Sequence, residues 1–483
     1  MDNLVNKSLN RFPSWLVSLF TSSNKELLAS FETLRKEIVI KTYLCRFFRH
    51  MQNQNRITLI KPQEFPFFYG YIVLFIGSLG ILASIPGQTI GVSVFTDPVK
   101  DALGLTRNEF SNAYMIGTLL SSALVARAGI WFDAYGARYV AFFATLLLGV
   151  SLLIFSVSVE ISEAIKSLFN FDSWLITFLL ITLLFFLIRF SGQGVLTMAS
   201  RNMIMMWFKK NRGKINSISS ITVSLGFSSA PILLNSLIDD YGWASSWQIM
   251  AMCLFIFCLC ILLLYRNRPE DFDLLPDGYD KKEVDQEAEE IETDFTLKEA
   301  KKTRAFWMFG LVLAFNSFYV TGFTFHIVSI FGSQDYTKAE AIAIFLPMSI
   351  IAIFVSTTCN ILSDYIQHKI YLFIMLASGV VASLGLLFLA YPIGVYLLVG
   401  GLGTMGGLFA VINAVTWPSF FGRKYLGSIT GKVMSLLVIA SAIAPSLFSY
   451  CFTALGSYKY ISYITIAFLL FLIVGSIKVK NPQ

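Results

Sequence analysis

Long apolar stretches alternate with short polar ones between residues 67 and 478. Each apolar stretch holds about 20 residues, the length that a helix needs to cross the hydrocarbon core of a bilayer. The pattern predicts twelve such helices in two sets of six. The expected spans are 68–92, 107–127, 139–159, 174–199, 214–238, 246–265, 305–331, 338–361, 370–391, 393–416, 426–450 and 456–477.

The same pattern divides the chain into four segments. A polar, basic leader (1–66) precedes a first six-helix half (67–265), and a charged linker (266–304) precedes a second half (305–483). The leader lacks the apolar core of a signal peptide, so we expect a cytoplasmic extension. The linker holds 13 Asp or Glu residues and eight Lys or Arg residues, so we expect it to stay in water and to be largely disordered.

Composition supports a membrane protein and argues against a soluble protein, a metalloprotein and an enzyme. Hydrophobic residues make up 55% of the 483 residues and charged residues only 14%, against about 25% charged residues in a soluble domain. The six cysteines show no paired or metal-like spacing, so we expect no metal site and no cofactor. No nucleophile–base cluster is present in the sequence, so we do not expect an enzyme.

The distribution of cations predicts the orientation. With both termini inside, the inner segments hold 31 Lys or Arg residues and the outer loops hold five. Cytoplasmic loops carry such an excess in membrane proteins. We therefore place the termini and the linker in the cytoplasm and the chain in a plasma (bacterial inner) membrane. This arrangement accounts for the net charge of +7 without a nucleic-acid partner.

A short polar link joins the second and third spans, and its pattern recurs in the second half between the eighth and ninth spans. Both copies carry a carboxylate followed by a cation at the same spacing, and glycines in the first copy allow tight turns. These residues are Gly129, Asp133, Gly136 and Arg138 in the first copy and Asp364 and Lys369 in the second.

The first copy resembles the G-x3-D-x2-G-x-R/K loop between helices 2 and 3 of the major facilitator superfamily, and the second copy resembles its degenerate loop between helices 8 and 9. This resemblance implies an all-α integral membrane fold of twelve transmembrane helices in two pseudo-symmetric six-helix halves. It also implies a secondary transporter that works by alternating access around a site between the halves, with the residues of the two links as a cytoplasmic gate. We expect a monomer. A further repeat pairs Ala230–Pro231 with Ala444–Pro445.

Arg189 is the one full charge that we expect deep within a span, about 22 Å along its helix. An intramembrane charge indicates a functional site. Two roles remain open: Arg189 can hold helices together through helix-1 carbonyls, or it can bind an anionic substrate or relay a proton. We expect other contributions to binding or coupling from polar residues near the spans, with His326 able to sense outer protons. These candidates are Gln193, Asn316, Asn413 and His326.

Two further stretches, Phe95–Arg107 and Trp207–Gly213, resemble the oxalate/formate and monocarboxylate group of the superfamily. That group places a cation in helix 8, and its oxalate exchangers add a lysine deep in helix 11. Here 339–362 holds no cation, and Leu436–Leu437 stands at the helix-11 position. These departures disfavour a dicarboxylate exchanger.

We therefore expect a transporter of a small organic solute, best a small organic anion such as a monocarboxylate, with or without a coupled proton. Two alternatives remain. A drug or metabolite exporter of the same fold is favoured by Gly226, Ala230 and Pro231, which partly match a helix-5 export motif. A receptor that resembles a transporter but moves nothing is compatible with the long leader and linker.

Overall fold

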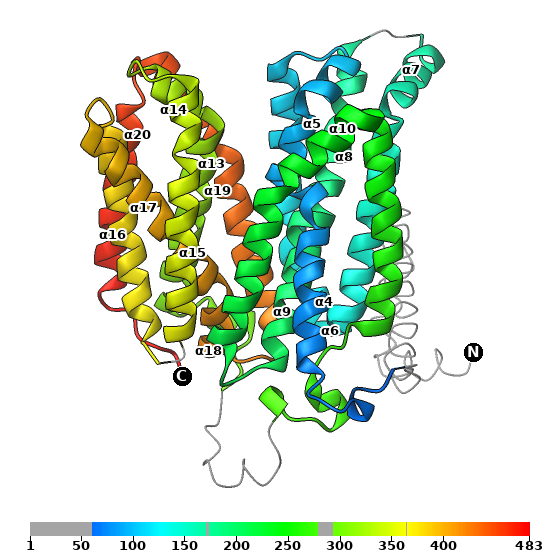
Figure 1. Ribbon diagram of the computed structural model, residues 1–483, viewed down its shortest axis with the longest axis vertical. Coiled ribbons are helices and arrows are strands. Elements are labelled where there is room, and N and C mark those ends of the chain that lie inside the picture. The colour runs from blue at the N-terminus through cyan, green and yellow to red at the C-terminus, as the bar shows by residue number, and fades with distance from the viewer. Residues whose placement is uncertain (1–59, 171–172, 279–292, 364) are drawn as a thin grey trace, which may run out of the picture. The chain divides into compact units, whose positions relative to one another are not determined.

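The computed structural model describes residues 60–483 except 171–172, 279–292 and 364 (Figure 1). All regular elements in this part of the chain are helical, and ten helical runs are long and apolar enough to cross a membrane. Two of these runs are interrupted by a glycine with positive φ, Gly136 at 81° and Gly242 at 77°. Each interrupted run therefore supplies two crossings, and the prediction of twelve helices in an all-α membrane fold is confirmed.

The first half begins with a crossing in two pieces and contains a π-helical segment in its fourth crossing. Its elements are η2 (Pro62–Glu64), α4 (Gly70–Ala83), η3 (Ile85–Gly87), α5 (Thr89–Ala102), α6 (Arg107–Ser156), α7 (Ser158–Leu168), α8 (Trp174–Ile188), the π-helix η4 (Arg189–Leu196), α9 (Thr197–Trp207) and α10 (Arg212–Leu264).

The second half also contains a π-helical segment in its fourth crossing, while its first crossing is the unbroken helix α13. Its elements are α13 (Arg304–Gly332), α14 (Lys338–Ala343), α15 (Phe345–Leu362), α16 (His368–Leu387), α17 (Pro392–Val411), the π-helix η7 (Ile412–Thr416), α18 (Trp417–Phe421), α19 (Leu426–Leu455) and α20 (Lys459–Ser476).

A pair of corresponding contacts shows the repeat in three dimensions. The Arg138 guanidinium donates to the carbonyl oxygen of Leu262, near the end of the sixth crossing. In the second half, Lys369 Nζ donates to the carbonyl oxygen of Ile477 at 2.8 Å, at the end of the twelfth. Each cation thus neutralises part of the negative end of a helix dipole, and each ties the third crossing of its half to the sixth.

The break in the first crossing packs directly against the π-helix of the fourth. A Cβ added to Gly87 would lie 2.4 Å from the carbonyl oxygen of Ile188 and 2.8 Å from Cα of Gly192. No larger residue fits at this distance, so both glycines allow the two backbones to approach. π-Helical turns inside α-helices occur frequently at functional sites, and this one positions Arg189.

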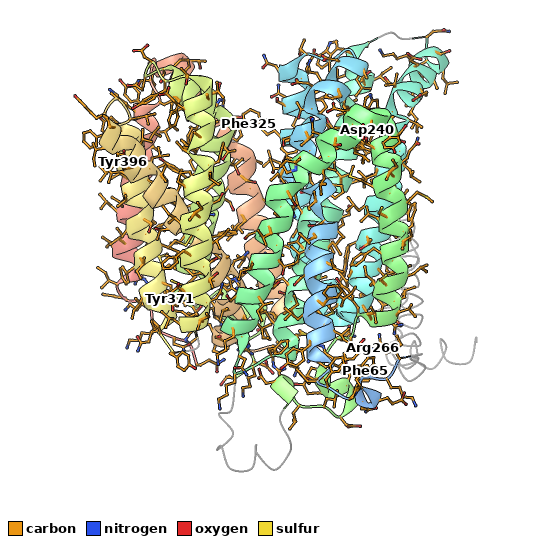
Figure 2. All side chains as sticks on the ribbon, viewed as in Figure 1. Phe65, Asp240, Arg266, Phe325, Tyr371 and Tyr396 are labelled. Carbon is orange, nitrogen blue, oxygen red and sulfur yellow. The ribbon has the colours of Figure 1, made fainter. Side chains whose placement is uncertain are left out.

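We call the side of the protein that carries the Gly129–Arg138 link, the linker and the C-terminus the linker face. Arg266 donates to the carbonyl oxygen of Ile60 at 2.8 Å, and the backbone N–H of Thr293 donates to Gln483 Oε1 at 2.9 Å. Figure 2 shows Arg266 at this face and Asp240 at the opposite one. The first described residue and the C-terminus therefore lie on one side.

The linker was expected to be largely disordered, and this prediction is wrong for 266–278 and 293–304. These parts contain η5 (Pro269–Phe272), η6 (Pro276–Gly278) and α12 (Leu297–Ala300). In α12, Glu299 accepts hydrogen bonds from the side chain and the backbone N–H of Thr296, which lower the pKa of the Glu299 carboxyl. Such a capping box stabilises a helix start. The number of charged residues in the linker does not reveal that one of them, Glu299, accepts the hydrogen bonds that begin a helix.

Candidate functional site

The predicted gate residue Asp133 joins the two halves at the linker face. Its Oδ1 accepts the backbone N–H of Gly427 at 2.6 Å, and its Oδ2 accepts that of Ser428 at 2.7 Å. These N–H groups are in the first turn of α19, which has no earlier helical carbonyls to receive them. A carboxylate at a helix N-terminus is also favoured by the helix dipole. Arg138 instead contacts its own half, through Leu262.

Glycines let the halves approach beside Asp133. A Cβ on Gly129 would lie 2.1 Å from the carbonyl oxygen of Gly427 and 3.1 Å from Cα of Gly431. α6 and α19 therefore touch backbone to backbone at this level. Gly136, the second predicted glycine, has φ of 81°, and a Cβ there would meet the Asn267 side chain at 2.2 Å.

Two amide contacts also join the halves at the linker face, and together with the Asp133 contacts we call them the seam. Asn202 Nδ2 donates to Thr430 Oγ1 at 2.7 Å. Asn216 Nδ2 donates to Asn360 Oδ1 at 2.6 Å and to the carbonyl oxygen of Ala410 at 3.2 Å. Asn216 and Thr430 occupy equivalent positions of the two halves, in the register that pairs Ala230–Pro231 with Ala444–Pro445. Each of the two contacts therefore includes one of these two equivalent positions. The linker face is closed in this conformation.

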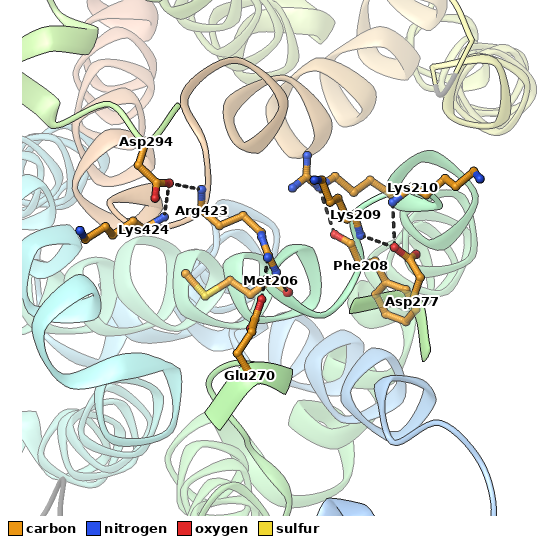
Figure 3. A network of polar contacts seen from close by, with 10 residues as sticks. Met206, Phe208, Lys209, Lys210, Glu270, Asp277, Asp294, Arg423 and Lys424 are labelled. Atoms are coloured by element: carbon orange, nitrogen blue, oxygen red, sulfur yellow. Dashed lines mark hydrogen bonds and ion pairs between the residues drawn. The ribbon is translucent and has the colours of Figure 1, made fainter. Parts of the chain in front are cut away.

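Two linker aspartates bind corresponding loops of the two halves (Figure 3). Asp277 accepts the backbone N–H groups of Lys209 and Lys210 at 2.7 and 2.8 Å. Asp294 accepts those of Arg423 and Lys424, each at 3.1 Å. The two loops are equivalent in the same register of the sequence repeat. Each end of the linker is therefore fixed to one half.

Arg423 connects the halves directly. Its Nη1 donates to the carbonyl oxygen of Met206 at 2.7 Å, and its Nη2 lies 2.6 Å from Glu270 Oε1. Arg268 also reaches across, with Nη2 3.2 Å from the carbonyl oxygen of Lys424. Sequence reasoning missed these contacts, because the charged linker offered many equivalent pairings.

Arg189 starts η4 and is almost completely buried, with 1% of its surface exposed. Its Nη1 donates to the carbonyl oxygen of Gly87 at 3.0 Å and to Thr89 Oγ1 at 3.3 Å. Its Cζ lies 5.1 Å from the centre of the Tyr114 ring. The guanidinium thus holds the broken first crossing against the fourth, as one of its two expected roles requires. Its Nε is buried and donates to no residue in the described part of the chain, and its two hydrogen bonds to described residues both come from Nη1, not Nη2.

A cluster of polar side chains lies at the same break. Gln88 Nε2 donates to Ser84 Oγ and to Thr197 Oγ1, each at 3.0 Å, and Thr197 Oγ1 donates to Ser84 Oγ at 2.9 Å. Gln193 Oε1 is buried and accepts no hydrogen bond from a described residue. Thr197 was not among the predicted site residues, because a single threonine in an apolar helix carries no distinct signal.

The predicted binding or coupling residues of the second half are His326, Asn316 and Asn413, and each has different surroundings. His326 Nε2 lies 2.9 Å from the carbonyl oxygen of Pro445, and its ring stacks on Phe448. Asn316 is buried, and its Oδ1 has no partner among the described residues. Asn413 is partly exposed within η7. Within the described residues, none of these side chains forms a hydrogen bond with Arg189.

The expected limits of the fourth span need one correction. The span was placed at 174–199, which left Arg201 outside it, but the helix continues to Trp207. The residues after Arg201 are apolar enough to extend the run. Of the predicted gate residues, Asp364 lies outside the described part of the chain. Within that part, no group of three or more His, Cys, Asp or Glu residues could hold a metal ion.

Residues 67–445 match the model of the family described as Major Facilitator Superfamily, and no curated protein sequence matches the chain. Three similar solved structures are the human organic anion transporter MFSD10 (TETRAN), a bacterial homologue of the iron transporter ferroportin in an outward-facing state, and the proton:xylose symporter XylE.

These structures are similar in fold but distant in sequence. Their identities to this chain are 13%, 14% and 14%, and their TM-scores are 0.56, 0.59 and 0.59. Each match covers 84% of this chain and 99%, 98% and 94% of the respective structure. The cargoes that their titles give differ, so the match concerns the fold.

Proposed function

This chain belongs to the Major Facilitator Superfamily, and from that premise we propose that it moves a small organic anion, best a monocarboxylate, across the membrane. It is a secondary transporter embedded in a bilayer. The proposal concerns its substrate class and the residues that bind the substrate. Arg189 is the proposed anion site.

One observation carries this proposal: the edge of the Arg189 guanidinium that is suited to a carboxylate has no partner among the described residues. Nη1 donates to Gly87 and Thr89, the buried Nε donates to no described residue, and no hydrogen bond joins Nη2 to one. Parallel N–H groups of a guanidinium can meet both oxygens of a carboxylate. One edge can therefore hold the first crossing in place while the other binds an anion, so the two expected roles are compatible.

The charge balance supports the same proposal. Among the described residues, the polar and ring contacts of the Arg189 guanidinium are with a carbonyl, a hydroxyl and an aromatic ring, and none of these carries a full negative charge. A cation inside the membrane needs compensation, because its transfer from water costs about 2.5–3.5 kcal/mol on insertion scales. A bound carboxylate supplies the missing charge. Gln193, one turn further, offers an amide for a second polar group of the substrate.

The closed seam at the linker face supports an outward-facing resting conformation. In the proposed cycle, the anion binds from the opposite face, and the seam from Asp133 to Asn360 opens to release it. We place the linker face in the cytoplasm, because the predicted inner segments carry most of the cations. His326 is the proposed proton-sensing residue, since imidazole titrates near neutral pH.

Uptake by purified protein in proteoliposomes tests the proposal. Radiolabelled formate, acetate, lactate and pyruvate are compared with their amides, with and without an imposed proton gradient. We expect uptake of at least one carboxylate and loss of uptake for its amide, which has nearly the same shape but no charge. Equal uptake of an acid and its amide contradicts an anion site and favours a neutral substrate. Uptake of hydrophobic cations alone favours an exporter, and binding without uptake favours a receptor.

A further inference from the structure

We propose that Arg201 is a second anion-binding residue, which receives the substrate when the linker face is open. This inference rests on the proposed anion transport and adds a release-side site to it. Arg201 lies in α9, in the same crossing as Arg189 and closer to the linker face. Their separation in sequence corresponds to roughly 18 Å along a helix.

Arg201 is partly buried, yet its guanidinium has no partner in the part of the chain that the structure describes. Within residues 60–483, no hydrogen bond, ion pair or ring contact joins it to a described residue. Most other arginines of this region donate to a backbone carbonyl, as do Arg138, Arg189, Arg212, Arg266, Arg268, Arg304 and Arg423. Arg127, which has no such bond among the described residues, is exposed.

The position of Arg201 is not one that lipid headgroups reach. Residues three or four positions away share its side of the helix. These neighbours, Thr197, Met198, Ile204 and Met205, are each at most 5% exposed. Arg201 itself is only partly exposed. Its side of α9 therefore faces protein, and the missing counter-charge has to come from within the transporter.

The turn that carries Arg201 borders the seam between the halves. The next residue, Asn202, donates to Thr430 of α19, and the carbonyl oxygen of Met206 accepts from Arg423. In the present conformation these contacts close the linker face next to Arg201. When they separate, the guanidinium lies beside the opening. An anion that leaves Arg189 toward the linker face then meets a second unpaired cation before it reaches water.

A second cation of this kind has a clear chemical role. A carboxylate held only by Arg189 would have to leave a compensated site for a low-dielectric passage, which is unfavourable for a charged group. A fully available guanidinium further along lowers that barrier, because it can form the same paired hydrogen bonds. Arg201 thus determines affinity at the linker face, while Arg189 determines affinity at both faces.

Vesicles of both orientations from expressing cells test the inference. Radiolabelled formate, acetate, lactate and pyruvate are offered to the linker face in one vesicle type and to the opposite face in the other. We expect Arg201→Gln to raise KM at the linker face at least tenfold and to change KM at the opposite face less than twofold. Arg201→Lys keeps the charge and should retain most of the affinity. Arg127→Gln, which removes an exposed arginine of the same half, is the matched control.

The outcomes separate this inference from the proposed function. If the unmodified protein takes up none of the four anions, the proposed function fails and this inference with it. If uptake occurs and depends on Arg189, but Arg201→Gln leaves KM at the linker face unchanged, only the role of Arg201 is overturned. If Arg201→Gln does not fold, Arg201→Met provides a second neutral variant. If neither neutral variant folds, while Arg201→Lys folds and has unchanged KM at both faces, Arg201 has a structural role instead.

Discussion

The carboxylate of Asp133 accepts the backbone N–H of Gly427 at 2.6 Å, and this contact links α6 of the first half to α19 of the second. Asp133→Asn removes the charge with little change in volume. We expect the closed linker face to lose about 1–3 kcal/mol relative to the open state. Spin labels at Lys209 and Lys480, exposed positions of the two halves, should report a longer mean distance in the variant.

Asp239→Asn is the control for this change, because it alters an exposed carboxylate in the fifth crossing that contacts Asn235 of its own helix. An unchanged distance in Asp133→Asn, together with normal transport, would show that Asp133 does not hold the gate.

The close approach at Gly129 gives a second prediction. Gly129→Ala places a methyl group where the carbonyl oxygen of Gly427 lies 2.1 Å away, so the halves have to separate at the linker face. The same spin-label pair should again report a longer distance. Gly400→Ala is the matched control, since a Cβ there meets nothing within 4 Å. Equal behaviour of the two variants would exclude backbone contact as the reason for glycine at 129.

Arg423 gives a third prediction, because it contacts both Met206 and Glu270. Hydrogen bonds with a charged group contribute about 1.5–3 kcal/mol each when buried, and partial exposure reduces this contribution here. We expect Arg423→Gln to open the linker face measurably, though less than Asp133→Asn. Lys424→Gln removes a charge from the same loop, where the side chain lies over the Tyr425 ring. Identical distances in both variants would mean that only the charge of the loop matters.

The predicted orientation can be tested on intact cells. In a background without native cysteines, Lys298→Cys of the linker and Asp240→Cys of the opposite face provide single labelling sites. A membrane-impermeant maleimide added outside should label the second and not the first. Labelling of the linker in sealed cells would reverse the assignment.

The sequence was sufficient to predict the spans, and to select residues of the polar link as a candidate gate, for a physical reason. Helices that cross lipid need long apolar runs. A tight polar link between two such helices needs glycine, and a carboxylate in it can cap a helix, so Gly129 and Asp133 were recognisable in the sequence. The residues that Asp133 contacts in the second half were not recognisable in the sequence. Gly427 and Ser428 contribute only backbone N–H groups to Asp133, and any residue type could supply them.

The remaining differences have similar causes. Arg201 looked like the end of a span because charge usually marks a boundary, yet the apolar residues after it continue the helix. The linker looked disordered because its net composition is acidic, while its order depends on Asp277 and Asp294 meeting particular backbone groups. The edge of Arg189 that has no partner among the described residues depends on which of its nitrogens reaches Gly87, and a sequence does not specify this.

Carboxylate binding by purified Arg189→Gln tests the central claim most directly. The probe is whichever of formate, acetate, lactate and pyruvate the unmodified protein takes up fastest, and folding is checked by monodispersity and thermal unfolding. We predict a folded variant whose affinity for the carboxylate falls at least tenfold, while Arg189→Lys shows an intermediate loss. A folded Arg189→Gln that binds the carboxylate with unchanged affinity would contradict the account and leave Arg189 as a helix-bridging residue alone.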